Sequence, residues 1–340
     1  MTESKDNIIP ESWLDDLPKE SRVEGYNPEE MIQCSKCARS NPPNRLDCMY
    51  CGVDLEFSAE QSGNLRPKLR KAENWKNAHN VIFLRRDADL ENKDLREAAK
   101  MVRIEPGDLE KMLDLESPIP LARSDQETEI GIVVRRLDEL GLKTVVFEDS
   151  VFELSSRPKR LRRLEFIDGS IEITFFNDGT VRKIDRSAIS QIVVGVLFEH
   201  RVESTEKQKR KKDEKTILET AETSEDELVI DIFLKDDPIG FRISANGFDF
   251  STLGQEKSMF VGQNMKTLIA KLRSFSPAAR FDESYLSIRG YLSNIWDVEE
   301  QTDSKGLKRG GFGGYNRELV TTSNNTEQFT RYSRLLWHLK

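Results

Sequence analysis

The chain has 340 residues, with 52 Lys and Arg against 60 Asp and Glu, and its formal net charge is −8. This acidic balance differs from that of general nucleic-acid binders, which usually present a net basic face. No apolar run approaches the length of a membrane-spanning helix, about 18 residues, and the first residues, MTESKDNIIP, lack the basic and apolar stretches of an export signal. We therefore expect a cytoplasmic protein without a membrane span, long enough for two or three domains.

Two segments near the N-terminus carry no periodic pattern. Residues 1–30 are rich in acidic side chains, which predicts a disordered leader. The alternative for this segment is a short docking motif around Trp13-Leu14-Asp15-Asp16-Leu17. Residues 57–78 are predicted to be a linker, because they lack a pattern of their own.

Between these segments stand all four cysteines of the chain, as two CxxC pairs with the turn residues Asn41-Pro42-Pro43-Asn44 between them. Two tight turns that each present two sulfurs supply the four thiolates that a tetrahedral zinc ion takes at about 2.3 Å. Redox chemistry or disulfides are the alternative. A redox CxxC, however, normally lies between a buried strand and the start of a helix, whereas turn residues separate these two pairs. We predict a ribbon over residues 31–56 that holds one structural Zn²⁺ ion, with the ligands Cys34, Cys37, Cys48 and Cys51.

Two families resemble this pattern. Cys48-Met-Tyr-Cys51-Gly52 resembles the short zinc ribbons that begin many bacterial proteins, in which a CxxCG turn directs backbone N–H groups at the sulfurs. The spacing C-x2-C-x3-N-x6-C-x2-C, with Asn41 as its Asn, is similar to the Ran-binding-protein-type zinc finger, whose members bind ubiquitin or single-stranded RNA. That family has a Trp where this chain has Ile32, so we rank the bacterial-type ribbon first.

Residues 79–150 are predicted to form a small α/β sandwich with the order β-α-α-β-α-β. Asp94 and Pro106 suit helix starts, and Gly141 suits a helix end. The strands are expected at 81–84, 119–122 and 143–147, and the helices at 94–102, 106–114 and 125–140.

This order, with the segments 95–100 and 137–142, resembles the C-terminal domain of the bacterial ribosomal stalk protein. In that family the domain recruits translation factors, chiefly through basic helix residues. Here the corresponding surface mixes basic and acidic residues, namely Arg96 and Lys100 with Asp94 and Glu97. The resemblance therefore implies the fold of that domain rather than its function.

Residues 158–276 are predicted to form an antiparallel β domain. Asp168-Gly169 and Asn177-Asp178-Gly179 are hairpin turn signals. About seven strands followed by a helix at 258–275 resemble the pleckstrin-homology-like fold. The strands are expected at 161–167, 171–176, 181–185, 190–201, 216–221, 227–235 and 240–250.

The remaining residues, 277–340, are predicted to be an extension with a Gly-rich loop and a helix. Residues 306–315, GLKRGGFGGY, resemble RGG segments, in which Arg and aromatic side chains stack on RNA bases; a single copy predicts a flexible loop. The apolar residues of the C-terminal helix are expected to pack back on a domain, with a partner-binding helix as the alternative: Phe329, Tyr332, Leu335, Leu336 and Leu339.

Two basic clusters, at 157–163 and 207–212, are candidate sites for phosphate groups of lipid or nucleic acid, although the second also fits a solvated loop. The histidines His79, His200 and His338 fall in separate segments, and no HExxH or GxSxG motif occurs. We therefore predict no catalytic residues and no small-molecule substrate. An enzyme whose polar groups come from distant segments is the remaining alternative.

Together these features predict an α+β multidomain interaction or adaptor protein that binds zinc and an unidentified protein partner. The alternative is an RNA- or ribosome-associated protein, which would bind through the zinc finger and the basic clusters.

Overall fold

The structure, a computed structural model, describes residues 31–43, 45–53, 55–56, 69, 77–115, 117–208, 215–309 and 315–339. The chain divides into two compact units, residues 1–68 and 69–340, and mixes helices with several sheets as expected. The predicted leader at 1–30 and almost all of the predicted linker at 57–78 lie outside the described residues.

In the first unit, β1 (Ile32–Gln33) pairs with β2 (Ser40–Asn41) in an antiparallel hairpin. Its core consists of Ile32 and Leu55 together with Cys34 and Cys48. The buried apolar side chains described in this unit, Ile32, Leu46 and Leu55, together with the cysteines bury too little surface to hold it, which is the usual situation of a metal-stabilised module.

In the second unit, the segment predicted as an α/β sandwich has the expected element order. Its three strands form an antiparallel sheet of order β4-β3-β5. The helices bury one face each, because their apolar residues recur with the helical period. The elements are β3 (His79–Arg86), α2 (Asn92–Val102), α3 (Pro106–Asp114), β4 (Ile119–Ser124), α4 (Glu127–Glu139) and β5 (Leu142–Glu148).

The larger sheet has the order β13-β14-β9-β10-β11-β6-β7-β8, with β12 beside β9. Its strands are β6 (Lys159–Ile167), β7 (Ser170–Phe175), β8 (Val181–Asp185), β9 (Ile189–Gln208), β10 (Lys215–Leu234), β11 (Asp237–Ser244), β12 (Arg280–Asp282), β13 (Glu299–Arg309) and β14 (Tyr315–Asn324). Three more helices belong to this unit: α5 (Val261–Phe275), α6 (Tyr285–Leu292) and α7 (Thr326–His338).

Two predictions about this sheet are wrong. Six strands rather than about seven precede α5, because β10 is one strand of 20 residues across the two segments predicted at 216–221 and 227–235. Pairing with β9 keeps the polar residues between them extended. The sheet is also not wholly antiparallel, because β11 pairs with β6 and β12 pairs with β9 in parallel.

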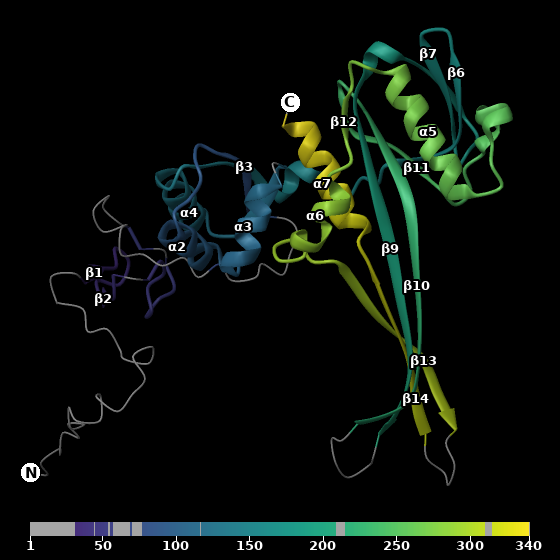
Figure 1. Cartoon of the computed structure of the whole chain (residues 1–340). Helices are drawn as coiled ribbons and strands as arrows, with labels where there is room; N and C mark the ends of the chain where they lie inside the picture. The colour runs from purple at the N-terminus through teal and green to yellow at the C-terminus, as the bar shows by residue number, and fades with distance from the viewer. Residues whose placement is uncertain are drawn as a thin grey trace, which may run out of the picture. The chain divides into compact units, whose positions relative to one another are not determined.

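The central strands carry a core on each face, since alternate side chains of a strand point to opposite sides. Ile192 and Ile230 pack with Leu268 of α5. Their neighbours Val193 and Val229 belong to the second core, with α6 and α7. Figure 1 shows α5 and α7 on either side of the long strands β9 and β10.

The C-terminal helix α7 packs against the rest of the second unit. The apolar face of α7 is fully buried at Phe329, Tyr332, Leu335 and Leu336. The same core contains side chains of the α/β segment and of residues 277–340, so α7 joins these parts of the second unit.

A buried polar network reinforces this junction. Asp149 accepts hydrogen bonds from Arg123 at 2.7 Å and from Asn80 at 2.9 Å. The indole of Trp296, which is fully buried, donates to Asn80 Oδ1 at 2.8 Å. Each of these four side chains has a partner, as burial of polar groups requires.

Beyond the cores, β9, β10, β13 and β14 continue as a long four-stranded ribbon (Figure 1). The segment predicted as a Gly-rich loop divides here: residues 306–309 belong to β13, residue 315 begins β14, and residues 310–314 lie outside the described part. Of the basic segment 207–212, only the last two residues of β9 are described.

Candidate functional site

The four predicted ligands come together. Each pair of Sγ atoms among the four cysteines lies within 4.8 Å, with 3.6 Å between Cys34 and Cys51 and 3.5 Å between Cys37 and Cys48. Thiolates at about 2.3 Å around a tetrahedral ion are about 3.8 Å apart, so the cluster has the size that such an ion needs. All four cysteines are free rather than disulfide-bonded.

Two knuckles of the same geometry present these sulfurs. The N–H of Ala38 donates to Cys34 O, and the N–H of Gly52 donates to Cys48 O, both at 2.9 Å. Both donor residues have a positive φ, +57° at Ala38 and +71° at Gly52. Glycine takes this conformation without cost, which explains the CxxCG form of the second knuckle.

Asn41 links the two knuckles from the inside. Its fully buried amide donates to Cys48 Sγ at 3.5 Å and to Arg39 O at 2.9 Å. Its Oδ1 accepts the N–H of Met49 at 2.8 Å. Hydrogen bonds of this kind orient a ligand sulfur and stabilise its charge. The sequence marked Asn41 only as part of a spacing, and the structure supplies its role.

The sulfurs differ in acidity. Burial raises the pKa of Cys48, but hydrogen bonds from the backbone of Tyr50 and Cys51 outweigh it and lower the pKa to about 6. A backbone hydrogen bond from Cys37 lowers the pKa of Cys34. A backbone hydrogen bond from Arg39 also acts to lower the pKa of Cys37. Burial and hydrogen bonds with the other sulfurs outweigh it and raise the pKa of Cys37 to about 12. Crowded sulfurs thus retain a proton that a divalent cation would replace.

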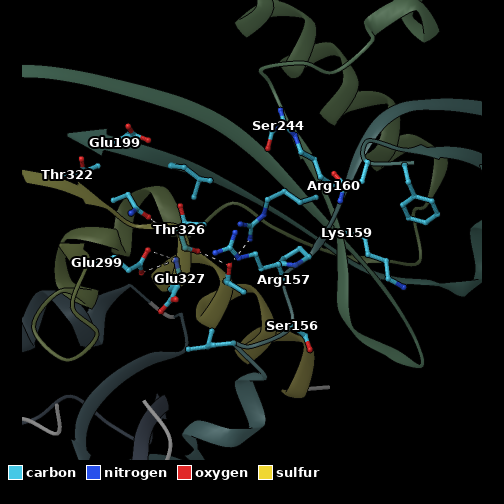
Figure 2. Close-up of a pocket in the computed structure, with 18 of the residues that line it drawn as sticks. Ser156, Arg157, Lys159, Arg160, Glu199, Ser244, Glu299, Thr322, Thr326 and Glu327 are labelled. Carbon is cyan, nitrogen blue, oxygen red and sulfur yellow. Dashed lines mark hydrogen bonds between the residues drawn. The ribbon is translucent and has the colours of Figure 1, made fainter. Parts of the chain in front are cut away.

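The second candidate site is a cavity of about 1140 Å³ in the unit 69–340, shown in Figure 2. Arg157, Lys159 and Arg160 of the first basic cluster line one side of it. Glu299 and Glu327 lie on the other side, near the start of α7 (Figure 2). The structure therefore places this predicted basic cluster beside a polar pocket that the sequence did not predict.

The acidic groups of this pocket have structural partners. Glu299 accepts the N–H of Glu327 at 3.1 Å, which caps the N-terminus of α7. The carboxylate of Glu327 pairs with the buried Arg331 at 2.8 Å. Burial raises the pKa of Glu299 to about 7. These contacts assign the two carboxylates to holding α7 in place.

The basic side of the pocket is similarly engaged. Arg242 forms two hydrogen bonds of 2.7 Å with Asp231 and a third, of 3.1 Å, with Thr330. The guanidinium of Arg160 lies 4.1 Å from the ring centre of Phe176. The arrangement positions charges of both signs around one cavity.

The histidines occupy three different elements. His79 begins β3, and His200 lies on β9 with Nε2 3.8 Å from Glu222. His338 ends α7, where its Nε2 is 3.2 Å from Val151 O and its ring is 6.0 Å from the ring of Phe147. His200 therefore lies near a carboxylate on the surface, and His338 packs against a backbone carbonyl and an aromatic ring.

Comparisons of the chain with models of protein families, with curated proteins and with solved structures give no match. The resemblances to the zinc-ribbon, stalk-protein and pleckstrin-homology-like families therefore stay predictions. In the described part of the chain, none of the helices combines the length and the apolar character needed to cross a bilayer.

Proposed function

We propose that the chain is a zinc-binding, non-catalytic interaction protein, in which the ion stabilises a binding module. The observation that carries this proposal is the closed cluster of four sulfurs. Four thiolates favour zinc over harder cations and leave no open position for water or substrate. Zinc here would hold the ribbon fold rather than perform chemistry.

The surface of the ribbon supports a role in protein binding. Met49 and Tyr50 lie between the ligands of the second knuckle and are 51 % and 50 % exposed. The guanidinium of Arg39 lies 4.7 Å from the ring centre of Tyr50. Tyr, Met and Arg are enriched at protein interfaces, and Tyr and Arg are also enriched among the residues that dominate binding energy. The metal would fix these three side chains in one patch, here called the knuckle patch.

Affinity purification with three forms of the full chain tests this function. The intact chain is expected to retain one zinc ion and a reproducible protein partner. Met49→Ser with Tyr50→Ser keeps all four ligands, so it should retain zinc and lose that partner. Leu286→Ser, at a residue that is 47 % exposed on α6, is the matched control and should retain both.

The partner is then confirmed with purified components, by titration of the intact chain and of the knuckle-patch variant. Equal affinity of the two forms would contradict a role of the patch in binding. A zinc-free intact chain would contradict the metal on which the proposal rests.

A further inference from the structure

Three consecutive apolar side chains stand in solvent where α5 begins, and we call them the α5 tip: Met259, Phe260 and Val261. Their exposed fractions are 98 %, 77 % and 45 %, and that of Met259 is the largest of any large apolar side chain in the described part of the chain. Single exposed apolar residues are common on protein surfaces, but contiguous ones mark an interaction site.

The backbone of the α5 tip is held by hydrogen bonds from both directions along the chain. The buried Asn264 accepts the N–H of Ser258 at 2.6 Å and donates to Ser258 O at 3.0 Å. The N–H of Phe260 donates to Ser258 Oγ at 3.2 Å. In the next turn of the helix, Met265 and Leu268 are fully buried in the core of the sheet. The helix therefore presents the tip at a fixed place.

Two common features of a helix start are missing at this place. The N-cap position usually holds Ser, Thr, Asp or Asn, and here it holds Phe260, whose side chain forms no cap. An apolar residue one position earlier usually packs against the fourth helical residue. Here that residue is the polar Asn264, and Met259 stays exposed. Helix stability therefore explains neither apolar side chain, as expected when both serve an external contact.

Basic residues flank the tip in the sequence. Residues 257–275 contain four Lys and Arg and no Asp or Glu, whereas the whole chain has 52 and 60. Lys257 precedes the tip and Lys266 follows it, and both are exposed. Of the other two, Lys271 pairs with Glu256 at 3.1 Å. An acidic protein thus carries a local basic segment, which directs an anionic partner to the tip.

We infer that the α5 tip inserts into the surface of an anionic lipid bilayer, an interaction beyond the zinc-dependent protein binding proposed above. Apolar side chains enter the boundary between headgroups and acyl chains, while lysines are attracted to the anionic headgroups. The extended backbone of Phe260 turns neighbouring side chains to opposite sides, and both Met259 and Phe260 are exposed. A bilayer surrounds such a protruding tip, whereas a flat protein surface would cover one side of it.

Co-sedimentation of the full chain with vesicles tests the inference. Vesicles of phosphatidylcholine with about 30 % phosphatidylserine should bind the intact chain more tightly than vesicles of phosphatidylcholine alone. Met259→Ser with Phe260→Ser keeps the lysines and should lose at least about 10-fold in affinity, because it removes the inserted apolar surface. Lys257→Gln with Lys266→Gln keeps that surface and should lose about 30-fold on the anionic vesicles.

Phe260→Trp reports insertion directly. Its added emission should shift to shorter wavelengths on anionic vesicles. Brominated phosphatidylcholine in these vesicles should quench it more than it quenches the emission of the intact chain. A tip that only supported the fold would show neither change, and that result would overturn the inference.

Val181→Ser with Leu286→Ser is the matched control, because it removes two apolar side chains that are 57 % and 47 % exposed elsewhere in the unit 69–340. Its affinity for anionic vesicles should stay within about twofold of that of the intact chain. An intact chain that fails to bind these vesicles at low salt, or a control that loses as much as the tip variant, would overturn the inference.

A protein partner is the competing occupant of the tip, and the same tip variant distinguishes it. A chain that binds no vesicles, but whose affinity-purified protein partner is lost on Met259→Ser with Phe260→Ser, would make the tip a protein contact and overturn the membrane inference. Vesicle binding that depends on the tip, with the protein partner retained, is the result that the inference predicts.

Discussion

Asn41 joins both cysteine knuckles through a single side chain, so it is the residue outside the ligand set whose loss should affect the metal most. Asn41→Asp keeps the size of the side chain and the acceptor for Met49, but it replaces the donor to Cys48 Sγ by an oxygen. We expect zinc affinity to fall by about 10- to 100-fold, as for other partners of metal ligands. Competition with a chromophoric chelator measures this change.

The control for that experiment is Lys36→Gln, which changes an exposed residue inside the first knuckle. It should leave zinc affinity unchanged. Equal affinities of the Asp variant and the intact chain would show that the Asn41 hydrogen bond does not support the metal.

Glu299 gives the folded chain a defined dependence on pH. Its folded pKa of about 7 lies above the ordinary value of a Glu carboxyl, so the folded state binds the proton more tightly than the unfolded state. The resulting stability is fully present below the unfolded pKa and is lost as the pH rises through about 7.

Glu299→Gln keeps an oxygen for the N–H of Glu327 and removes the titration. The free energy of unfolding of the variant, relative to that of the intact chain, should be about 1 kcal/mol higher at pH 8 than at pH 5. The difference is this small because the Glu299 side chain is only partly buried. Urea unfolding at the two pH values measures the difference. A gap that is the same at both pH values would contradict the assignment.

The contact between β9 and α7 depends on a glycine. A Cβ at Gly195 would lie 2.6 Å from Cδ2 of the Phe329 ring, which is fully buried. Gly195→Ala should therefore destabilise the second unit by about 1–3 kcal/mol through overpacking. Chemical unfolding of the full chain, followed by the fluorescence of its tryptophans, reports this change.

Gly131→Ala in the middle of α4 is the matched control, because nothing lies within 4 Å of the added Cβ. It should stabilise the chain by about 0.5–1 kcal/mol, as expected for alanine in an exposed helix position. If both substitutions had the same effect, close packing at Gly195 would not explain the result.

The helices and strands that the sequence predicted best are those set by local signals. α3 begins at Pro106 as expected, and α4 and β5 meet around Gly141. The continuous strand β10 was missed because residues 222–226 are polar and carry no apolar period. Only the long-range ladder with β9 keeps them extended, and a ladder partner is not visible in one segment.

At the scale of the whole molecule, the metal cluster could be predicted from the sequence because its four ligands lie close together along the chain. The pocket could not, since its walls come from β6, β13 and α7, which only the fold brings together.

The two compact units have separate cores, so the metal should affect them differently. Removal of zinc with a chelator should unfold the cysteine module of the first unit, whose described core cluster consists of Ile32, Leu55, Cys34 and Cys48, and leave the unit 69–340 folded. Hydrogen exchange should then increase in peptides from 31–56 and stay slow in α7. Loss of protection in α7 on chelation would show that the second unit also depends on the metal.

The most direct test of the account is the metal itself, measured on the full chain by elemental analysis and X-ray absorption. We predict one zinc ion per chain, with four sulfur neighbours at about 2.3 Å, and loss of that ion in Cys48→Ser. A chain purified under reducing conditions without metal, or zinc that Cys48→Ser retains in full, would contradict the closed four-thiolate site.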